Sequence, residues 1–367
     1  MKTQIRFYLG MLMLLLGLSF TVSATEAPKK IRIAGGVHVQ PDGSLALGGT
    51  LAVIELQGWL AAELAKKGIE LEYFATAHAA TGPMINEGFA NGSLDFASYG
   101  DLPSLVVNAG GVSTKLLVPN GRGGDAFLVV PTDSEAKSIH DLKGKRIAVH
   151  RGRPWELQFI KLLESEGLTY QDFRILNINP VAGAAAVASG KVEAFFITSQ
   201  AYLLEDKKAG KIIWSSKGGP ADWKMRTELW GHSGFVAKYP DLAQLIVTAW
   251  VKAAHWQAQE ENKATLLAMT TKDGNPESVV LRSWQDDSLS WRERWSPLFN
   301  PYVYSHYEHA IKVSLERKMI RKALTTDTLF APQFLHNALQ QLELQEFWLQ
   351  QPAEKTTAQP AGNGSAE

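Results

Sequence analysis

The 367-residue sequence contains no cysteine. This absence excludes a disulfide framework, a cysteine-ligated zinc or iron–sulfur centre and a thiol nucleophile. The chain also lacks an excess of charge of either sign, because 37 Lys and Arg balance 37 Asp and Glu. Nucleic-acid-binding proteins usually carry a clear basic excess, so the balance argues against that class. With 45% apolar and 20% charged residues, the composition is typical of a globular protein, and the length suggests about two domains.

Both ends of the sequence are expected to lie outside the folded part. A positively charged start is followed by an apolar run from Phe7 to Val22, and Ala24 completes a small-residue cleavage signal. This pattern is typical of a secretory signal peptide over residues 1–24, so we expect a secreted protein that begins at Thr25. Large apolar residues are absent from 352–367, which predicts a disordered tail.

Strand-like and helix-like patterns alternate through the first 210 or so residues, with glycine at the ends of many helices. Such alternation predicts an α/β fold with parallel-rich sheets and helices on both faces. From Asp241 onward the pattern is helical and rich in aromatic residues. The predicted strands are 31–34, 69–74, 94–97, 113–118, 146–149, 174–178 and 193–197, and the predicted helices include 50–67, 102–109, 181–189 and 200–208.

We find no enzyme motif. The run Gly231-His232-Ser233-Gly234 lacks the glycine that a nucleophile elbow needs two residues after the serine. His306 and His309 share a helix face, but no nearby acids complete a metal set, so we interpret them as structural. Gly121-Arg122-Gly123-Gly124 lacks the spacing of a phosphate-binding loop, and we interpret it as a surface loop. We predict no catalytic residue, no metal and no cofactor.

The stretch from Trp284 to Tyr307 holds three tryptophans and three tyrosines. One interpretation is an aromatic platform for a sugar or another ring. The other is packing within the core or against a lobe, which we favour because aromatic residues are more often buried than used for binding.

Several helices begin directly after predicted strands, where ligands bind in open α/β sheets. Free N–H groups and the positive end of the helix dipole make such starts suitable for an oxyanion, and Ser or Thr adds a hydroxyl donor. Any single start could be a simple helix cap. The starts are Gly49-Thr50, Thr81-Gly82-Pro83, Tyr99-Gly100-Asp101, Arg151-Gly152-Arg153 and Thr198-Ser199.

The order and spacing of several short motifs resemble the periplasmic solute-binding proteins of ABC importers, of the aliphatic-sulfonate, taurine and nitrate type. The motifs are Gly49-Thr50-Leu51, Gly82-Pro83, the run 88–96, Tyr99-Gly100-Asp101-Leu102-Pro103, the run 141–146 and the run 167–172.

The resemblance implies a type II periplasmic binding protein, with two lobes joined by two crossing strands at a hinge. The crossings would fall near Phe127–Val130 and Gly234–Ala237. The first lobe would comprise 28–127 and 237–351, and the second 128–236. A small organic anion would bind in the cleft, and the protein would act as a periplasmic monomer with a cognate ABC permease and ATPase. Family position puts ligand contacts at Thr50, Thr81, Gly82, Gly100, Asp101, around Gly152 and near Thr198 and Ser199.

The sequence departs from the family pattern where specificity is set. The loop from Val37 to Gly48 is longer and adds His38 and Gln40 near the cleft. Arg151 and Arg153 flank a helix start, where a guanidinium could bind a sulfonate through two hydrogen bonds. Two solvated arginines at the rim are an equally good interpretation.

We therefore expect an organosulfonate or sulfate ester as the ligand, and two alternatives stay open. The first is a pyrimidine or other thiamine-precursor ring bound by the same fold, for which Tyr99, Trp155 and the tryptophans after Lys211 could supply aromatic surfaces. The second is a secreted enzyme on this fold, with His78 or His232 beside Asp101 as its catalytic pair.

Overall fold

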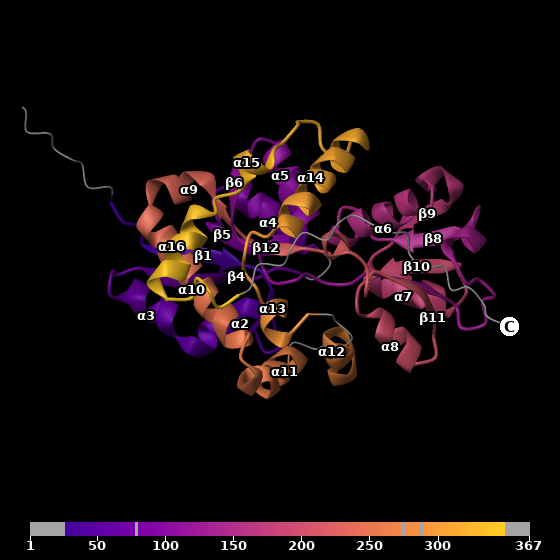
Figure 1. Cartoon of the computed structure of the whole chain (residues 1–367), viewed down its shortest axis with the longest axis horizontal. Coiled ribbons are helices and arrows are strands. Elements are labelled where there is room, and N and C mark those ends of the chain that lie inside the picture. The colour runs from indigo at the N-terminus through magenta and orange to yellow at the C-terminus, as the bar shows by residue number, and fades with distance from the viewer. Residues whose placement is uncertain (1–25, 78–79, 273–275, 286–288, 349–367) are drawn as a thin grey trace, which may run out of the picture.

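The protein is built around two five-stranded sheets, each covered by helices (Figure 1). The computed structural model describes residues 26–77, 80–272, 276–285 and 289–348, so the predicted signal peptide and tail lie outside the described residues. We call the sheet that begins the chain, with its helices, the first lobe, and the other sheet with its helices the second lobe. This architecture confirms the predicted α/β fold with parallel-rich sheets.

The sheet of the first lobe has the strand order β4-β1-β5-β12-β6. β1 runs parallel to β4 and β5, whereas β12 is antiparallel to both of its neighbours. The strands are β1 (Lys30–Ala34), β4 (Glu70–Phe74), β5 (Phe96–Gly100), β6 (Thr114–Val118) and β12 (Thr227–His232).

The sheet of the second lobe has the order β11-β7-β10-β8-β9. β8 is parallel to β9 and β10, and β7 is antiparallel to β10 and β11. The strands are β7 (Phe127–Val130), β8 (Arg146–Val149), β9 (Arg174–Asn177), β10 (Ala194–Ile197) and β11 (Lys211–Ser215). A separate hairpin of β2 (Val37–Val39) and β3 (Leu45–Leu47) forms in the segment predicted to be a long loop.

Helices surround each sheet, and a last group connects the lobes. No helix of the described residues combines the length and apolar character that crossing a membrane requires. The helices that surround the first sheet are α2 (Gly49–Gln57), α3 (Trp59–Ala65), α4 (Thr81–Ala90), α5 (Asp101–Ala109), α9 (Ser233–Lys238), α10 (Pro240–Gln257), α15 (Thr326–Leu329) and α16 (Gln333–Gln341). Those of the second are α6 (Pro154–Ser165), α7 (Pro180–Ala188) and α8 (Ala201–Asp206). The remaining helices are α11 (Lys263–Lys272), α12 (Glu277–Trp284), α13 (Trp291–Arg294) and α14 (Pro301–Glu316), and the 3₁₀ turns are η1 (Ile139–Leu142), η2 (Tyr170–Asp172), η3 (Ala221–Trp223) and η4 (Glu260–Asn262).

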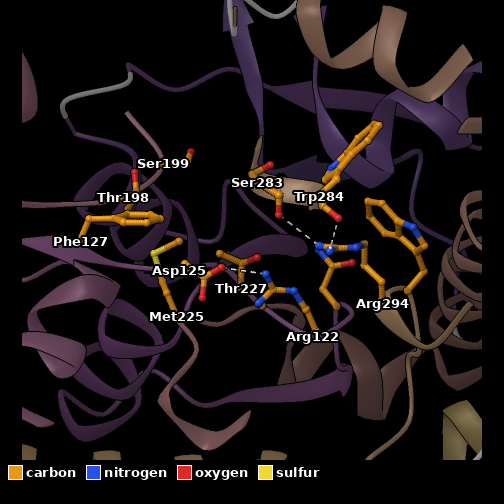
Figure 2. Close-up of a pocket in the computed structure, with 14 residues that line it drawn as sticks. Arg122, Asp125, Phe127, Thr198, Ser199, Met225, Thr227, Ser283, Trp284 and Arg294 are labelled. Carbon is orange, nitrogen blue, oxygen red and sulfur yellow. Dashed lines mark hydrogen bonds and ion pairs between the residues drawn. The ribbon is translucent and has the colours of Figure 1, made fainter. Parts of the chain in front are cut away.

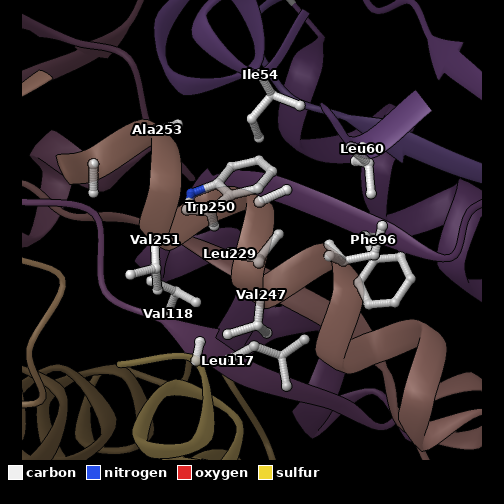
Figure 3. Close-up of a cluster of buried hydrophobic side chains, with 14 of the residues drawn as sticks. Ile54, Leu60, Phe96, Leu117, Val118, Leu229, Val247, Trp250, Val251 and Ala253 are labelled. Carbon is white, nitrogen blue, oxygen red and sulfur yellow. The ribbon is translucent and has the colours of Figure 1, made fainter. Parts of the chain in front are cut away.

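The largest hydrophobic core forms where α10 packs on the first sheet (Figure 3). Val247, Trp250 and Val251 are at most 1% exposed and lie against Val118 and Leu229. Full burial of such a side chain contributes about 1.5–3 kcal/mol. The predicted helical segment after Asp241 thus completes the first lobe, although the second lobe separates it from that lobe in sequence.

The predicted helix 50–67 is wrong in one respect, because it is two helices. Gly58 has φ 63°, in the left-handed region, and its N–H donates to the carbonyl oxygens of Ile54 and Glu55. This closes α2 and allows α3 to begin in a new direction. Glycine adopts the left-handed conformation without steric cost, which explains the break at this residue.

The crossing points implied by the family resemblance also need correction. Residues 127–130 form β7 inside the second sheet, and residues 233–238 form α9. The chain instead passes between the lobes in 119–126 and returns in 216–226, which we call the crossing segments. They are joined by an antiparallel backbone bridge between Gly124 and Met225. The lobe boundaries stay a prediction, although strand pairing assigns 227–232 to the first sheet.

Candidate functional site

A cavity of about 320 Å³ lies along the crossing segments, between the second lobe and the C-terminal helices α12 and α13 (Figure 2). Its wall combines hydroxyl, amide and charged groups with aromatic rings. The lining residues are Asn120, Arg122, Gly123, Gly124, Asp125, Phe127, Thr198, Ser199, Met225, Thr227, Ser283, Trp284, Arg294 and Trp295.

Glycines in the first crossing segment allow close backbone contact at the cavity. Gly121 has φ 67°, and a Cβ placed there would lie 2.5 Å from the carbonyl oxygen of Arg294. Gly123 has φ 86°, and its Cβ would lie 2.5 Å from the carbonyl oxygen of Met225. Both positions therefore require glycine. The interpretation of 121–124 as a surface loop is wrong, because the Arg122 side chain between these glycines is only 6% exposed.

Asp125 is the charged centre of the cavity wall. Its carboxylate accepts hydrogen bonds from Arg122 Nη2 at 2.7 Å and Lys224 Nζ at 2.8 Å. Burial alone would raise the pKa of Asp125, but the two cations outweigh it and lower the pKa to about 2. The carboxylate is therefore ionised, and it fixes both cations beside the cavity.

Acid should remove the stabilisation that Asp125 provides. Its folded-state pKa lies below its ordinary value of 3.8, so this stabilisation is present above about pH 4 and is lost as pH falls toward 2. We expect it to amount to about 2 kcal/mol. Urea unfolding between pH 2 and 7 checks this, because Asp125→Asn should lower stability at pH 7 and flatten its decline below pH 4. The exposed Asp133→Asn serves as the control, and equal slopes for all three proteins would contradict the expectation.

Tryptophans from the aromatic stretch form one wall of the cavity. The ring of Trp291 is buried and packs edge to face against Trp284 at 5.0 Å and Trp295 at 5.5 Å between centroids. Trp284 and Trp295 are partly buried and line the cavity. Trp291 thus packs in the core, whereas Trp284 and Trp295 line the cavity, and the aromatic platform stays a prediction.

Three of the residues predicted from helix starts belong to this cavity or its edge. Thr198 and Ser199 follow β10 and line it directly. Thr50, in the first turn of α2, donates its hydroxyl to Asn120 Oδ1 at 3.1 Å, and Asn120 lines the cavity. The structure thus brings Thr50 of the first lobe to within one hydrogen bond of the cavity that Thr198 and Ser199 of the second lobe line, and their role as ligand contacts stays a prediction.

Gly82, Gly100 and Arg153 lie where the two lobes touch directly. A Cβ placed on Gly100 would lie 2.2 Å from Pro154 Cγ, across the boundary between β5 and α6. A Cβ placed on Gly82 would lie 3.7 Å from Arg153 Nη1. The Arg153 side chain thus extends from the second lobe to the first turn of α4, where burial lowers its pKa.

Arg151 and Gly152 bind a carboxylate of their own chain. Glu156, which is 1% exposed, accepts from the Gly152 N–H at 2.5 Å and from Arg151 Nε at 3.0 Å. Tyr170 adds a third donor at 3.1 Å. The predicted anion site at this helix start therefore holds an internal anion, which stabilises the first turn of α6.

Tyr99 and Asp101 are buried behind the lobe contact. Asp101 Oδ2 lies 2.7 Å from His306 Nε2, and both side chains are at most 1% exposed. His306 thus ties α14 to α5, in agreement with its structural interpretation. His232 lies at the other end of β12, since Thr227 pairs with Gly100 and Gly231 with Phe96. The suggested pairing of His232 with Asp101 is therefore wrong, and His78 lies outside the described residues.

The remaining predicted residues, His38, Gln40 and Thr81, lie in the N-terminal part of the first lobe. His38 Nδ1 lies 2.9 Å from the carbonyl oxygen of Thr76, whose hydroxyl lies 3.3 Å from that of Thr81. Gln40 lines a separate cavity of about 300 Å³ beside β3 and α11. No cluster of three or more potential metal ligands occurs among the residues that the structure describes.

Sequence reasoning missed Asn120, Arg122, Thr227 and Arg294 as cavity residues. Arg294 donates to the carbonyl oxygens of Ser283 and Trp284, which holds the end of α12 beside α13. The one local signal was the glycine-flanked arginine at 121–124, since paired glycines indicate close backbone approach.

Comparison with known proteins adds a family to this geometry. Residues 64–264 match the family described as NMT1/THI5 like. A solved structure from Methylobacillus flagellatus KT, described as the periplasmic sulfonate-binding protein SsuA of a sulfonate ABC transporter, is 44% identical. That match covers 90% of this chain and 100% of the other, with a TM-score of 0.81.

Two further similarities are more distant. A Bacillus subtilis (strain 168) protein named as an aliphatic sulfonates-binding protein is 25% identical over 297 residues, which cover 79% of this chain and 85% of that protein. The solved desulfurization enzyme DSZB is 18% identical, with a TM-score of 0.63 over 86% of this chain and 100% of that one. This last similarity concerns the fold alone. From the family match and the 44% identity, the chain belongs to the NMT1/THI5-like family.

Proposed function

We propose that the chain is the solute-binding receptor of an ABC importer and that its ligand is a small organosulfonate. The observation that carries this proposal is the 44% identity, over 90% of the chain, to the Methylobacillus flagellatus sulfonate-binding protein. The 25% identity to the Bacillus subtilis protein over most of its length supports the same assignment.

The cavity on the crossing segments has the chemistry that this ligand needs. Ser199 and Arg122 line it, and a hydroxyl and a guanidinium suit a sulfonate, which accepts hydrogen bonds through three oxygens. Thr198 also lines it, but its hydroxyl donates to Gln200 Oε1. Closure of two lobes about a hinge is a common way to enclose such a ligand. Within this proposal Thr198 and Ser199 contact the ligand, and Thr50 positions Asn120.

The proposal includes export and partners. The predicted signal peptide would direct the protein to the periplasm, where it would act as a soluble monomer and deliver its ligand to a permease and its ATPase. A desulfurization enzyme shares this fold. The proposal therefore includes that the protein does not convert its ligand chemically, and this is measured separately from binding.

Isothermal titration calorimetry of the chain from Thr25 tests the ligand. The panel comprises alkyl and aryl sulfonates, sulfate esters, taurine, nitrate and, for the thiamine-precursor alternative, a pyrimidine. We expect at least one sulfonate to bind with a micromolar or lower Kd and to be recovered unchanged after incubation. Binding of the pyrimidine alone, or release of sulfite or sulfate from the ligand, would contradict the proposal.

A further inference from the structure

The cavity has two chemically different ends. Figure 2 shows Phe127, Thr198 and Ser199 on one side and Trp284 and Arg294 on the other. The first group belongs to the second lobe, whereas Trp284, Arg294 and Trp295 come from α12, α13 and the residue after α13. A ligand that fills the cavity therefore contacts Thr198 and Ser199 at one end and Trp284 and Trp295 at the other.

The indole end is held rigidly. Trp284 and Trp295 both pack on the buried ring of Trp291, with interplanar angles of 70°. Arg294 fixes the backbone on either side, because its guanidinium binds the carbonyl oxygen of Trp284 at 2.9 Å and its own carbonyl accepts from the Arg122 N–H at 2.9 Å. Rings held in this way bind a ligand without the entropic cost of ordering side chains.

The carboxylate in the cavity wall is already paired. Asp125 binds Arg122 and Lys224 at 2.7 and 2.8 Å, and it also accepts from Ser216 Oγ at 3.2 Å. The ammonium group of a zwitterion such as taurine would have to compete with Arg122 and Lys224 for the two carboxylate oxygens of Asp125. The cavity therefore favours an anion without a positive charge.

We propose that the organic group of the ligand is aromatic, and that Trp284 and Trp295 select it. This inference rests on the proposed function. Planar rings gain more from contact with the indoles of Trp284 and Trp295 than a flexible alkyl chain of equal carbon number does.

A matched pair of ligands tests the inference on the unaltered protein. Benzenesulfonate and hexane-1-sulfonate share the headgroup and the number of carbons and differ in the planarity of the organic group. Calorimetry should give an affinity about tenfold higher for benzenesulfonate, which corresponds to the gain expected from one or two aromatic contacts. Equal affinity, or preference for hexane-1-sulfonate, would overturn the inference and leave the proposed function standing. Absence of binding by both ligands and by all other sulfonates would refute the proposed function itself.

Variants then assign the preference to residues. Trp284→Leu and Trp295→Leu should each lower the affinity for benzenesulfonate about five- to tenfold and change that for hexane-1-sulfonate by less than about twofold. Trp59→Leu is the matched control, since Trp59 lies on α3 outside the cavity and should alter neither affinity. Equal loss of both affinities in the two cavity variants would contradict selection by the indoles. Circular dichroism checks that each variant is folded. If a variant does not fold, the comparison of benzenesulfonate with hexane-1-sulfonate on the unaltered protein still tests the inference.

Discussion

Replacement of Arg226 by methionine is expected to lower the free energy of unfolding by about 3–5 kcal/mol. Arg226 and Glu228 form an ion pair in which the side chains are 4% and 0% exposed. Burial raises the pKa of Glu228 while Arg226 opposes this rise, so loss of the arginine would leave a buried carboxyl group without its cationic partner. Arg226 also donates to the carbonyl oxygen of Gly121 at 3.0 Å, which joins the two crossing segments. Urea unfolding followed by tryptophan fluorescence measures the loss.

The double variant Arg226→Met/Glu228→Gln provides the control for this prediction. The double variant removes both charges of the Arg226–Glu228 pair, so neither is left buried without the other. Replacement of a whole buried pair is often nearly neutral. The double variant should therefore be more stable than Arg226→Met alone. If the two variants were equally unstable, the loss would come from side-chain packing and not from an uncompensated charge.

Gly100→Ala is expected to weaken ligand binding by between about fivefold and a hundredfold, without unfolding the first lobe. The backbone of Gly100, with φ −68° and ψ 155°, is compatible with alanine. The added Cβ, however, would lie 2.2 Å from Pro154 Cγ in the other lobe. A proline ring cannot rotate away, so the lobes must separate, at a cost typical of overpacking of about 1–3 kcal/mol. Calorimetry with the best ligand of the sulfonate panel measures the change.

A compensating substitution separates this steric effect from a general loss of fold. In Gly100→Ala/Pro154→Ala the obstructing Cγ is absent, so affinity should return to within about threefold of that of Pro154→Ala alone. X-ray scattering should show a larger radius of gyration for Gly100→Ala than for the double variant. An unchanged affinity for Gly100→Ala would mean that the lobe contact is not part of the ligand-bound state.

The elements predicted from sequence are those with local signals. β1, β4, β6, β8, β9 and β10 agree with predicted strands to within one residue at each end, because short apolar runs and glycine stops mark them. β5 overlaps its predicted strand only at 96–97 and continues to Gly100. β12 carries no such signal, since it contains the charged Glu228, which is buried only because Arg226 pairs with it. Its strand character depends on β5 and β6, which are distant in sequence.

The residues of the candidate site also fall into those with a local sequence signal and those without one. Thr198 and Ser199 were found because they follow a buried strand at the edge where ligands bind. Asn120 and Arg122 lie in a crossing segment, and Trp284 and Arg294 lie in the C-terminal helices. These four residues come together only after both lobes and the C-terminal segment have packed, so no local pattern indicates their proximity.

The position of β12 also fixes the order in which the chain can fold. β5 and β6 are neighbours in sequence, but β12 lies between them in the sheet. As the chain becomes available from its N-terminal end, at the ribosome or on export, the first lobe lacks this middle strand until the whole second lobe has followed. The strands of the second lobe, β7 to β11, are contiguous in sequence and need no later residue to complete their sheet. Domains generally fold as units once their residues are available. The part of the chain that is made first is therefore completed last.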